Sequence, residues 1–85
     1  MNTCIISTFT CSYEDFYDMF ERTKPNWSKF VDNYNVAKLD ENKSIIVMNV
    51  IDFKSLQSFM SADEMLQWDK DNGCIDHVYS MESMG

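Results

Sequence analysis

The fold is decided by residues 44–51, which read Ser44-Ile45-Ile46-Val47-Met48-Asn49-Val50-Ile51. This segment is rich in β-branched residues and is the clearest strand in the chain. Side chains alternate along a strand, so one face carries Ile45, Val47 and Ile51, with Asn49 among them, and the other carries Ile46, Met48 and Val50. A sheet that is covered on one side only should alternate apolar with polar residues. Both faces of this strand are apolar, which indicates a central strand covered on both sides.

Three further strands are predicted around this segment. Thr3–Phe9 is rich in Ile, Thr and Phe without helical spacing, and Ile75–Met81 alternates as a last strand. Val36–Leu39 is a short strand candidate, separated from Ser44 by the polar residues 40–43. The sequence therefore predicts a hairpin with a four-residue loop in the middle of the chain.

A first helical region is predicted after Ser12, a residue that can cap a helix whose first turn carries Glu14 and Asp15. Its apolar face is Tyr13, Phe16, Tyr17 and Phe20, and the same phase continues through Trp27, Val31 and Tyr34. Pro25 interrupts this phase, because a proline inside a helix loses a hydrogen bond and clashes with the preceding turn. We expect a break or kink there, with Pro25 near the first position of a short second segment.

A second helical region is predicted between the hairpin and the last strand. Asp52 can cap a helix that carries Phe53, Leu56, Phe59 and Met60. Residues 61–64, Ser-Ala-Asp-Glu, form a capping box that restarts the helix, and Gly73 suits the left-handed position that ends it.

This order of elements predicts an α+β, ferredoxin-like β-α-β-β-α-β fold, with residues 1–85 forming one domain. Right-handed crossovers place the first and third strands in the centre of a four-stranded antiparallel sheet, with the helices on one face. The other apolar face is then uncovered, which is exceptional for a soluble monomer. We therefore expect a homodimer in which two copies pack sheet to sheet.

The run DFKSLQSFMSADEM at residues 52–65, followed by Gly73, resembles the second-helix signature of the dimeric α/β-barrel superfamily. This superfamily includes the antibiotic-biosynthesis monooxygenase-like and stress-responsive barrel domains. The whole chain is also similar, strand order included, to small uncharacterised bacterial proteins of that group. The resemblance implies the same fold and dimerisation. It consists of pattern rather than of invariant chemistry, so it implies no particular activity.

Composition limits the partners and the compartment. The 85 residues carry a formal net charge of −7, a surface that nucleic acid and anionic membranes would repel. Three cysteines, Cys4, Cys11 and Cys74, cannot all pair within one chain, and free thiols indicate a reducing cytoplasm. The N-terminus has no basic region and no long apolar core, so we expect no signal peptide and a cytoplasmic location.

No cofactor and no metal are predicted from the motifs. Cys11 stands alone where metal chaperones of this topology carry MxCxxC, and the central strands lack the aromatic and basic residues that stack RNA bases. The second helical region has no histidine for a haem. The acidic residues Asp63, Glu64, Asp69 and Asp71 are interpreted as a solvated helix face rather than a metal cluster.

The candidate site residues come from the residue types that line pockets in the cofactor-free monooxygenase members. His77 and Tyr79 share one face of the last strand and could bind an aromatic substrate and move a proton, so they are the catalytic candidates. Trp27, Trp68 and Asn49 are the ligand-binding candidates. A core or interface role is the simpler interpretation for the histidine and for both tryptophans. If there is a site, we expect it between the helices and the sheet.

Three functions remain open at this point. The first is a homodimeric small-molecule-binding or regulatory domain that takes a small apolar or aromatic ligand. The second is a cofactor-independent monooxygenase-like or isomerase-like enzyme acting on an aromatic or polyketide-like compound. The third is a structural or interaction module. An enclosed cavity of ~300 Å³ or more would favour the first two, and a filled core would favour the third.

Overall fold

The computed structural model describes residues 1–82 and residue 84. The chain is built around β3 (Lys43–Val50), which pairs antiparallel with β1 (Thr3–Thr8) on one side and with β2 (Val31–Asp40) on the other. The last strand, β4 (Ile75–Ser80), pairs antiparallel with the free side of β1, so the sheet order is β2-β3-β1-β4. The predicted α+β ferredoxin-like fold, with the first and third strands central, is confirmed.

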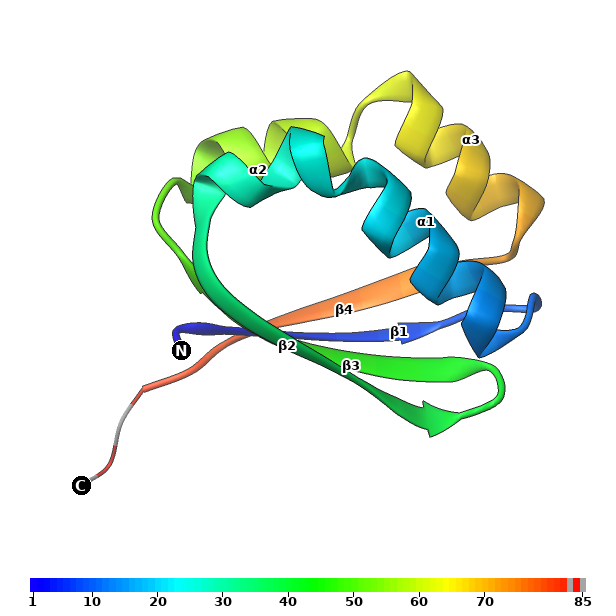
Figure 1. Ribbon diagram of the computed structural model, residues 1–85, viewed down its shortest axis with the longest axis horizontal. Helices are drawn as coiled ribbons and strands as arrows, with labels where there is room; N and C mark the ends of the chain where they lie inside the picture. The colour runs from blue at the N-terminus through cyan, green and yellow to red at the C-terminus, as the bar shows by residue number, and fades with distance from the viewer. Residues whose placement is uncertain (83, 85) are drawn as a thin grey trace.

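Helices cover one face of this sheet (Figure 1). They are α1 (Tyr13–Trp27), α2 (Phe53–Met60) and α3 (Asp63–Asp71), and a short 3-10 turn, η1 (Ser28–Phe30), leads from α1 into β2. Between the two layers lies a core of Ile5, Phe9, Phe16, Met19, Phe20, Trp27, Val31, Ile46, Met48, Val50, Leu56 and Met65. None of the described helices is both long enough and apolar enough to cross a membrane.

The burial of β3 follows the alternation that its sequence predicts. Ile46, Met48 and Val50 are buried beneath the helices, whereas Ile45 and Val47 on the opposite face are only partly covered. The same alternation runs through β1. We call the side of the sheet away from the helices the open face, and its side chains are Cys4, Ile6, Thr8, Asn33, Asn35, Ala37, Asp40, Lys43, Ile45, Val47, Asn49, Ile75, His77 and Tyr79.

The first helix begins as predicted but does not break at Pro25. The Ser12 hydroxyl caps it by accepting a hydrogen bond from the Asp15 N–H at 3.1 Å, and α1 continues through Pro25 to Trp27. Pro25 lies in the last turn, so little helix follows the residue whose N–H is missing. Trp27 is 3% exposed and its ring lies 4.6 Å from that of Phe20, which fixes the end of the helix in the core.

The predicted second helical segment after Pro25 is therefore wrong. Val31 and Tyr34 belong to β2, which begins at Val31 rather than Val36 and extends over ten residues. Tyr34 keeps its apolar contacts in the strand, because its ring packs edge-on against Phe20 at 5.5 Å and Trp27 at 5.1 Å. Val31 and Tyr34 are apolar because they pack against the helical layer from the sheet, and their spacing matched the helical pattern although they belong to a strand.

The second helical region is two helices, as the restart in the sequence indicates. Asp52 caps α2 by accepting a hydrogen bond from the Ser55 N–H at 3.1 Å. The predicted capping box is wrong, because Ser61 ends α2 and the residue before α3 is Ala62, which has no side-chain cap. Gly73 has a φ of 57°, the left-handed conformation predicted for it.

Candidate functional site

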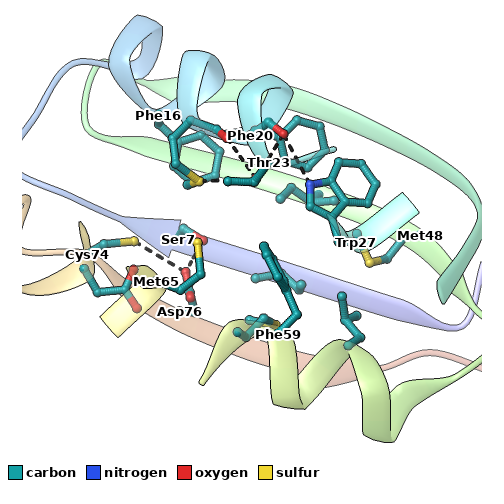
Figure 2. A pocket seen from close by; sticks show the side chains of 16 residues that line it. Ser7, Phe16, Phe20, Thr23, Trp27, Met48, Phe59, Met65, Cys74 and Asp76 are labelled. Carbon is teal, nitrogen blue, oxygen red and sulfur yellow. Dashed lines mark hydrogen bonds between the residues drawn. The ribbon is translucent and has the colours of Figure 1, made fainter. Parts of the chain in front are cut away.

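A cavity of about 70 Å³ lies between the helical layer and the sheet (Figure 2). Its walls are apolar side chains from both layers, namely Ile5, Phe16, Met19, Phe20, Trp27, Ile46, Met48, Leu56, Phe59, Met60 and Met65. Four of these are methionines, whose flexible side chains adapt to irregular shapes. The volume is below the ~300 Å³ expected of a preformed small-molecule pocket.

The polar groups in the wall under α1 are already satisfied by backbone carbonyls. The Thr23 hydroxyl donates to the Met19 carbonyl at 2.9 Å, and the Trp27 indole N–H donates to the Phe20 carbonyl at 3.2 Å. Trp27 therefore presents only its apolar ring to the cavity. A ligand would find its polar partners elsewhere.

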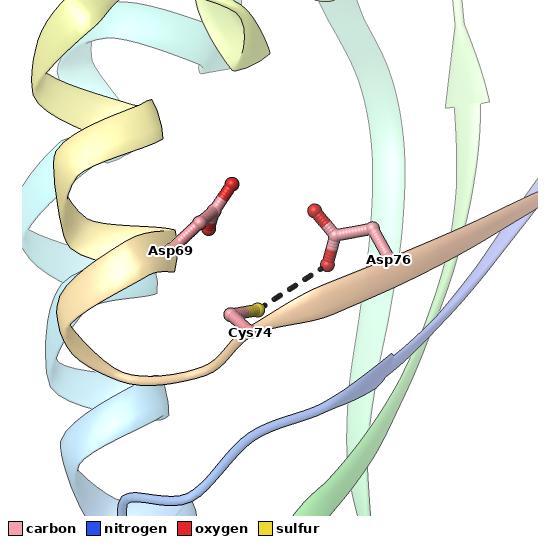
Figure 3. A group of neighbouring side chains, drawn as sticks. All are labelled: Asp69, Cys74 and Asp76. Carbon is pink, nitrogen blue, oxygen red and sulfur yellow. Dashed lines mark hydrogen bonds between the residues drawn. The ribbon is translucent and has the colours of Figure 1, made fainter.

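Those partners lie at one end of the cavity, where Ser7, Asp69, Cys74 and Asp76 meet. The Ser7 hydroxyl donates to Asp76 Oδ1 at 2.6 Å, and the Cys74 thiol donates to the same oxygen at 3.5 Å (Figure 3). Asp69 reaches this point from α3, and its carboxylate, the thiol and the Asp76 carboxylate each have an atom within 4.8 Å of the others. We call Asp69, Cys74 and Asp76 the acidic end of the cavity.

Burial and mutual repulsion shift the acid–base behaviour of this group. Desolvation, followed by the nearby Asp76 carboxylate, raises the pKa of Asp69 to about 6. Desolvation, and then the two carboxylates, raise the pKa of the Cys74 thiol far above its usual range. The thiol therefore stays protonated at neutral pH and is a poor nucleophile, whereas Asp69 can accept or release a proton near neutrality.

Two carboxylates and a thiol are also a donor set that could hold a divalent cation. A metal would have to displace the thiol proton, and the raised pKa of Cys74 opposes this. Such groups are common in proteins without a metal, and three donors leave any coordination shell incomplete.

Two surface hollows adjoin the cavity. One, of about 290 Å³, shares Leu56, Met60 and Asp76 with it. The other, of about 230 Å³, shares Met19, Thr23 and Met65. Methionine side chains separate the cavity from each hollow, so movement of Met60 or Met65 would enlarge the space available to a ligand.

The structure places the predicted catalytic candidates outside this cavity. His77 pairs with Ile6 and Tyr79 pairs with Cys4, so both side chains lie on the open face, and Asn49 lies there too. The expectation that His77 and Tyr79 line a site between helices and sheet is therefore wrong. The register of β4 on β1 turns Asp76 and Val78, rather than His77 and Tyr79, toward the helices.

The two tryptophans have different positions. Trp27 lines the cavity, as proposed for a ligand-binding residue. Trp68 packs edge-on against Phe16, with ring centroids 6.3 Å apart, and borders the outer hollow beside α3 instead. It contributes to the core rather than to the cavity wall.

Sequence reasoning missed the acidic end. The sequence predicts Asp69 on a solvated helix face, whereas the structure places it against the cavity and only partly exposed. The alternation of Asp76 with His77 was visible in the sequence, but which of the two faces the helices depends on the pairing of β4 with β1. Cys74 follows the left-handed Gly73 directly, and this turn brings it back toward α3.

Comparison with known proteins supports the fold. No protein-family model matches the sequence, and no curated protein matches it. Among solved structures, the chain is similar to SnoaB, a cofactor-independent oxygenase from Streptomyces nogalater, with a TM-score of 0.64, 9% identity, and coverage of 98% of this chain and 93% of that one. A protein provisionally assigned as an antibiotic biosynthesis monooxygenase from Deinococcus radiodurans gives a TM-score of 0.52 at 11% identity, covering 98% and 93%. The chain shares the ferredoxin-like fold of these structures.

Proposed function

We propose that this protein is a homodimeric small-molecule-binding domain whose ligand enters the cavity between the helices and the sheet. The observation that carries the proposal is an apolar cavity between the two layers with a charged end, formed by the partly buried Asp69 and Cys74 and the exposed Asp76. Partial burial of the Asp69 carboxylate opposes its ionisation, as its raised pKa indicates. The hydrophobic core alone does not require this carboxylate.

The size of the cavity limits the ligand. About 70 Å³ is roughly half the volume of a cavity that binds benzene, so the resting cavity suits a compact branched or linear compound. A larger apolar or aromatic ligand would require movement of Met60 or Met65 toward the adjoining hollows.

The open face supports the homodimer. It exposes aliphatic and aromatic side chains, among them Ile75 and Tyr79 at 58% and 52% exposure. Among its paired strand positions the charged residues are Asp40 and Lys43, which lie opposite each other in the register, although the net charge is −7. Two acidic molecules can therefore meet across this face with little opposition between like charges. In such a dimer His77, Tyr79 and Asn49 contact the partner.

The test uses the methionine methyl groups as reporters. Met19, Met48, Met60 and Met65 line the cavity, whereas Met1 and Met84 are exposed elsewhere and serve as internal controls. Titration with isobutanol, followed by ¹H–¹³C NMR, should shift the four cavity methyls and leave the control methyls unchanged. Equal shifts at all methyls, or none, would leave the structural module as the better account of the chain.

A cofactor-independent oxygenase acting on an aromatic or polyketide-like compound is the second candidate. It is favoured by the likeness to SnoaB and by Asp69, whose pKa of about 6 suits a group that takes a proton from a bound compound. Oxygen uptake with such compounds, absent in an Asp69→Asn variant, would support catalysis. Ligand binding without oxygen uptake would support the first proposal.

A further inference from the structure

We infer that the ligand of this cavity is an apolar monocarboxylic acid, whose carboxylate lies between Lys29 and Lys54 and whose hydrocarbon body enters the cavity past Phe59. The inference rests on the proposed function, because it names the chemical class of ligand for the same cavity. It follows from a third surface hollow, from the charges around this hollow and from the side chain that the hollow shares with the cavity.

This hollow, of about 500 Å³, lies where the end of α1 and η1 meet α2, and we call it the lysine hollow. Its volume is within the range of about 300–1,000 Å³ that small-molecule pockets occupy. The Phe30 carbonyl accepts hydrogen bonds from the N–H groups of Ile51 at 2.9 Å and Asp52 at 3.4 Å, so η1 is tied to the start of α2. The lining residues are Asn26, Lys29, Phe30, Lys54, Ser55, Ser58 and Phe59.

The lysine hollow is a basic place on an acidic chain. Its lining contains two lysines and no acidic residue, although the chain has 14 acidic and 7 basic residues. Among the described residues, the cations that form ion pairs are Arg22 and Lys38. Lys29 and Lys54 are exposed and have no carboxylate partner within this part of the chain, so both are available to an anion.

The position of Lys54 is unfavourable for its own helix. It lies in the first turn of α2, where the helix dipole favours acidic side chains and opposes a cation. The carboxylate of Asp52 is occupied as the helix cap, because it accepts hydrogen bonds from the Ser55 N–H at 3.1 Å and the Ser55 hydroxyl at 2.7 Å. A bound carboxylate would therefore compensate a charge that the helix itself does not stabilise.

Phe59 connects the lysine hollow with the cavity, because its side chain lines both. Figure 2 shows this side chain pointing from α2 into the cavity. A change of the Phe59 rotamer would join the two spaces, and a hydrocarbon chain would then take the place of the ring against the adaptable methionines.

The opposite ends of the cavity give the ligand its direction. Trp27 follows Asn26 of the lysine hollow in the chain, and it lies on the far side of the cavity from Cys74 (Figure 2). The acidic end beside Cys74 repels a carboxylate, whereas lysine ammonium groups donate charge-assisted hydrogen bonds to it, which are about twice as strong as neutral ones. The carboxylate therefore belongs at the lysines and the apolar body inside.

The experiment compares hexanoate, hexanol and hexylamine, which share one hydrocarbon chain, with acetate, which lacks most of it. Each is titrated at pH 7, and the four cavity methionine methyls report on the body of the ligand, while the backbone amides of Lys54 and Ser58 report on its head. We expect hexanoate to shift both sets and to bind at least about fivefold more tightly than hexanol, with hexylamine the weakest of the three. Acetate should bind at least about tenfold more weakly than hexanoate, because it buries fewer methylene groups.

Three variants separate the lysine hollow from the general charge of the protein. Lys29→Gln and Lys54→Gln should each lower the affinity for hexanoate at least about threefold and leave the affinity for hexanol unchanged. Lys70→Gln removes the same charge from an exposed position on α3 and should change neither affinity. An equal loss in all three variants would overturn the inference, because the effect would then come from net charge alone.

The remaining outcomes distinguish the inference from the proposed function. If hexanol shifts the cavity methyls and hexanoate binds no more tightly, the inference is overturned and the proposed function stands. The same holds if hexanoate shifts the amides of the lysine hollow without the cavity methyls, because the two spaces are then separate. If none of the compounds shifts the cavity methyls, both are overturned.

Discussion

Asp69 illustrates how a single residue can oppose folding while it serves a site. Its folded-state pKa of about 6 lies above the usual aspartate value of 3.8, because the ionised carboxylate loses water and lies near Asp76. Between these two values the folded chain binds more protons than the unfolded chain. The free energy of unfolding is therefore highest, as far as Asp69 is concerned, below about pH 4, and this contribution is lost as the pH rises through 6.

We predict that Asp69→Asn stabilises the protein at pH 7 by about 1–2 kcal/mol, a value reduced for the partial exposure of the side chain to solvent. At pH 4 the variant and the wild type should be equally stable, because the wild-type carboxyl is then protonated. Urea unfolding at both pH values measures the difference. A variant that is less stable than wild type at pH 7 would show that the ionised Asp69 carboxylate stabilises the folded chain rather than destabilising it.

Gly73 allows a second prediction for a single residue. An added Cβ would lie 2.9 Å from Thr10 Cγ2, and φ is 57°, so Gly73→Ala should lower the free energy of unfolding by about 1–2 kcal/mol. Thr10→Ser removes Cγ2 but keeps the hydroxyl that donates to the Asn72 carbonyl. Thermal unfolding should show that Gly73→Ala costs less in the Thr10→Ser background, by the part due to the close contact. An equal cost in both backgrounds would assign the whole effect to φ.

At the scale of the element, α1 shows which residue fixes the end of a helix. Pro25 lies inside α1, whereas Trp27 anchors the last turn in the core. We expect Pro25→Ala to leave the fold intact and to change stability by no more than about 1–2 kcal/mol, because one backbone bond is gained and unfolded-state freedom increases. Trp27→Ala should cost about 3–5 kcal/mol. Chemical denaturation of the two variants tests this, and a larger loss in Pro25→Ala would contradict it.

The elements that could be predicted are those whose signals are local. The cap at Ser12, the cap at Asp52 and the left-handed Gly73 depend on residues within a few positions of each other, and all three are confirmed. The strand nature of residues 31–35 could not be predicted, because it comes from pairing with β3. The acidic end also depends on pairing, since one step in the register of β4 would exchange Asp76 for His77.

At the scale of the whole molecule, adjacent residues of β3 should have separate roles. Val47 lies on the open face and is partly exposed, whereas Met48 is 3% exposed beneath the helices. We expect the wild type to elute near twice its 10.0 kDa mass. Val47→Asp should yield a folded monomer, because each dimer would bury two uncompensated carboxylates, one from each copy. Met48→Asp should unfold the chain itself, because the charge enters the core.

The exposed substitution Gln57→Glu on α2 adds the same charge and should change neither property. Light scattering and circular dichroism on the three variants measure mass and folding separately. A wild type that is monomeric at micromolar concentration, or a dimeric Val47→Asp, would exclude the open face as the dimer interface.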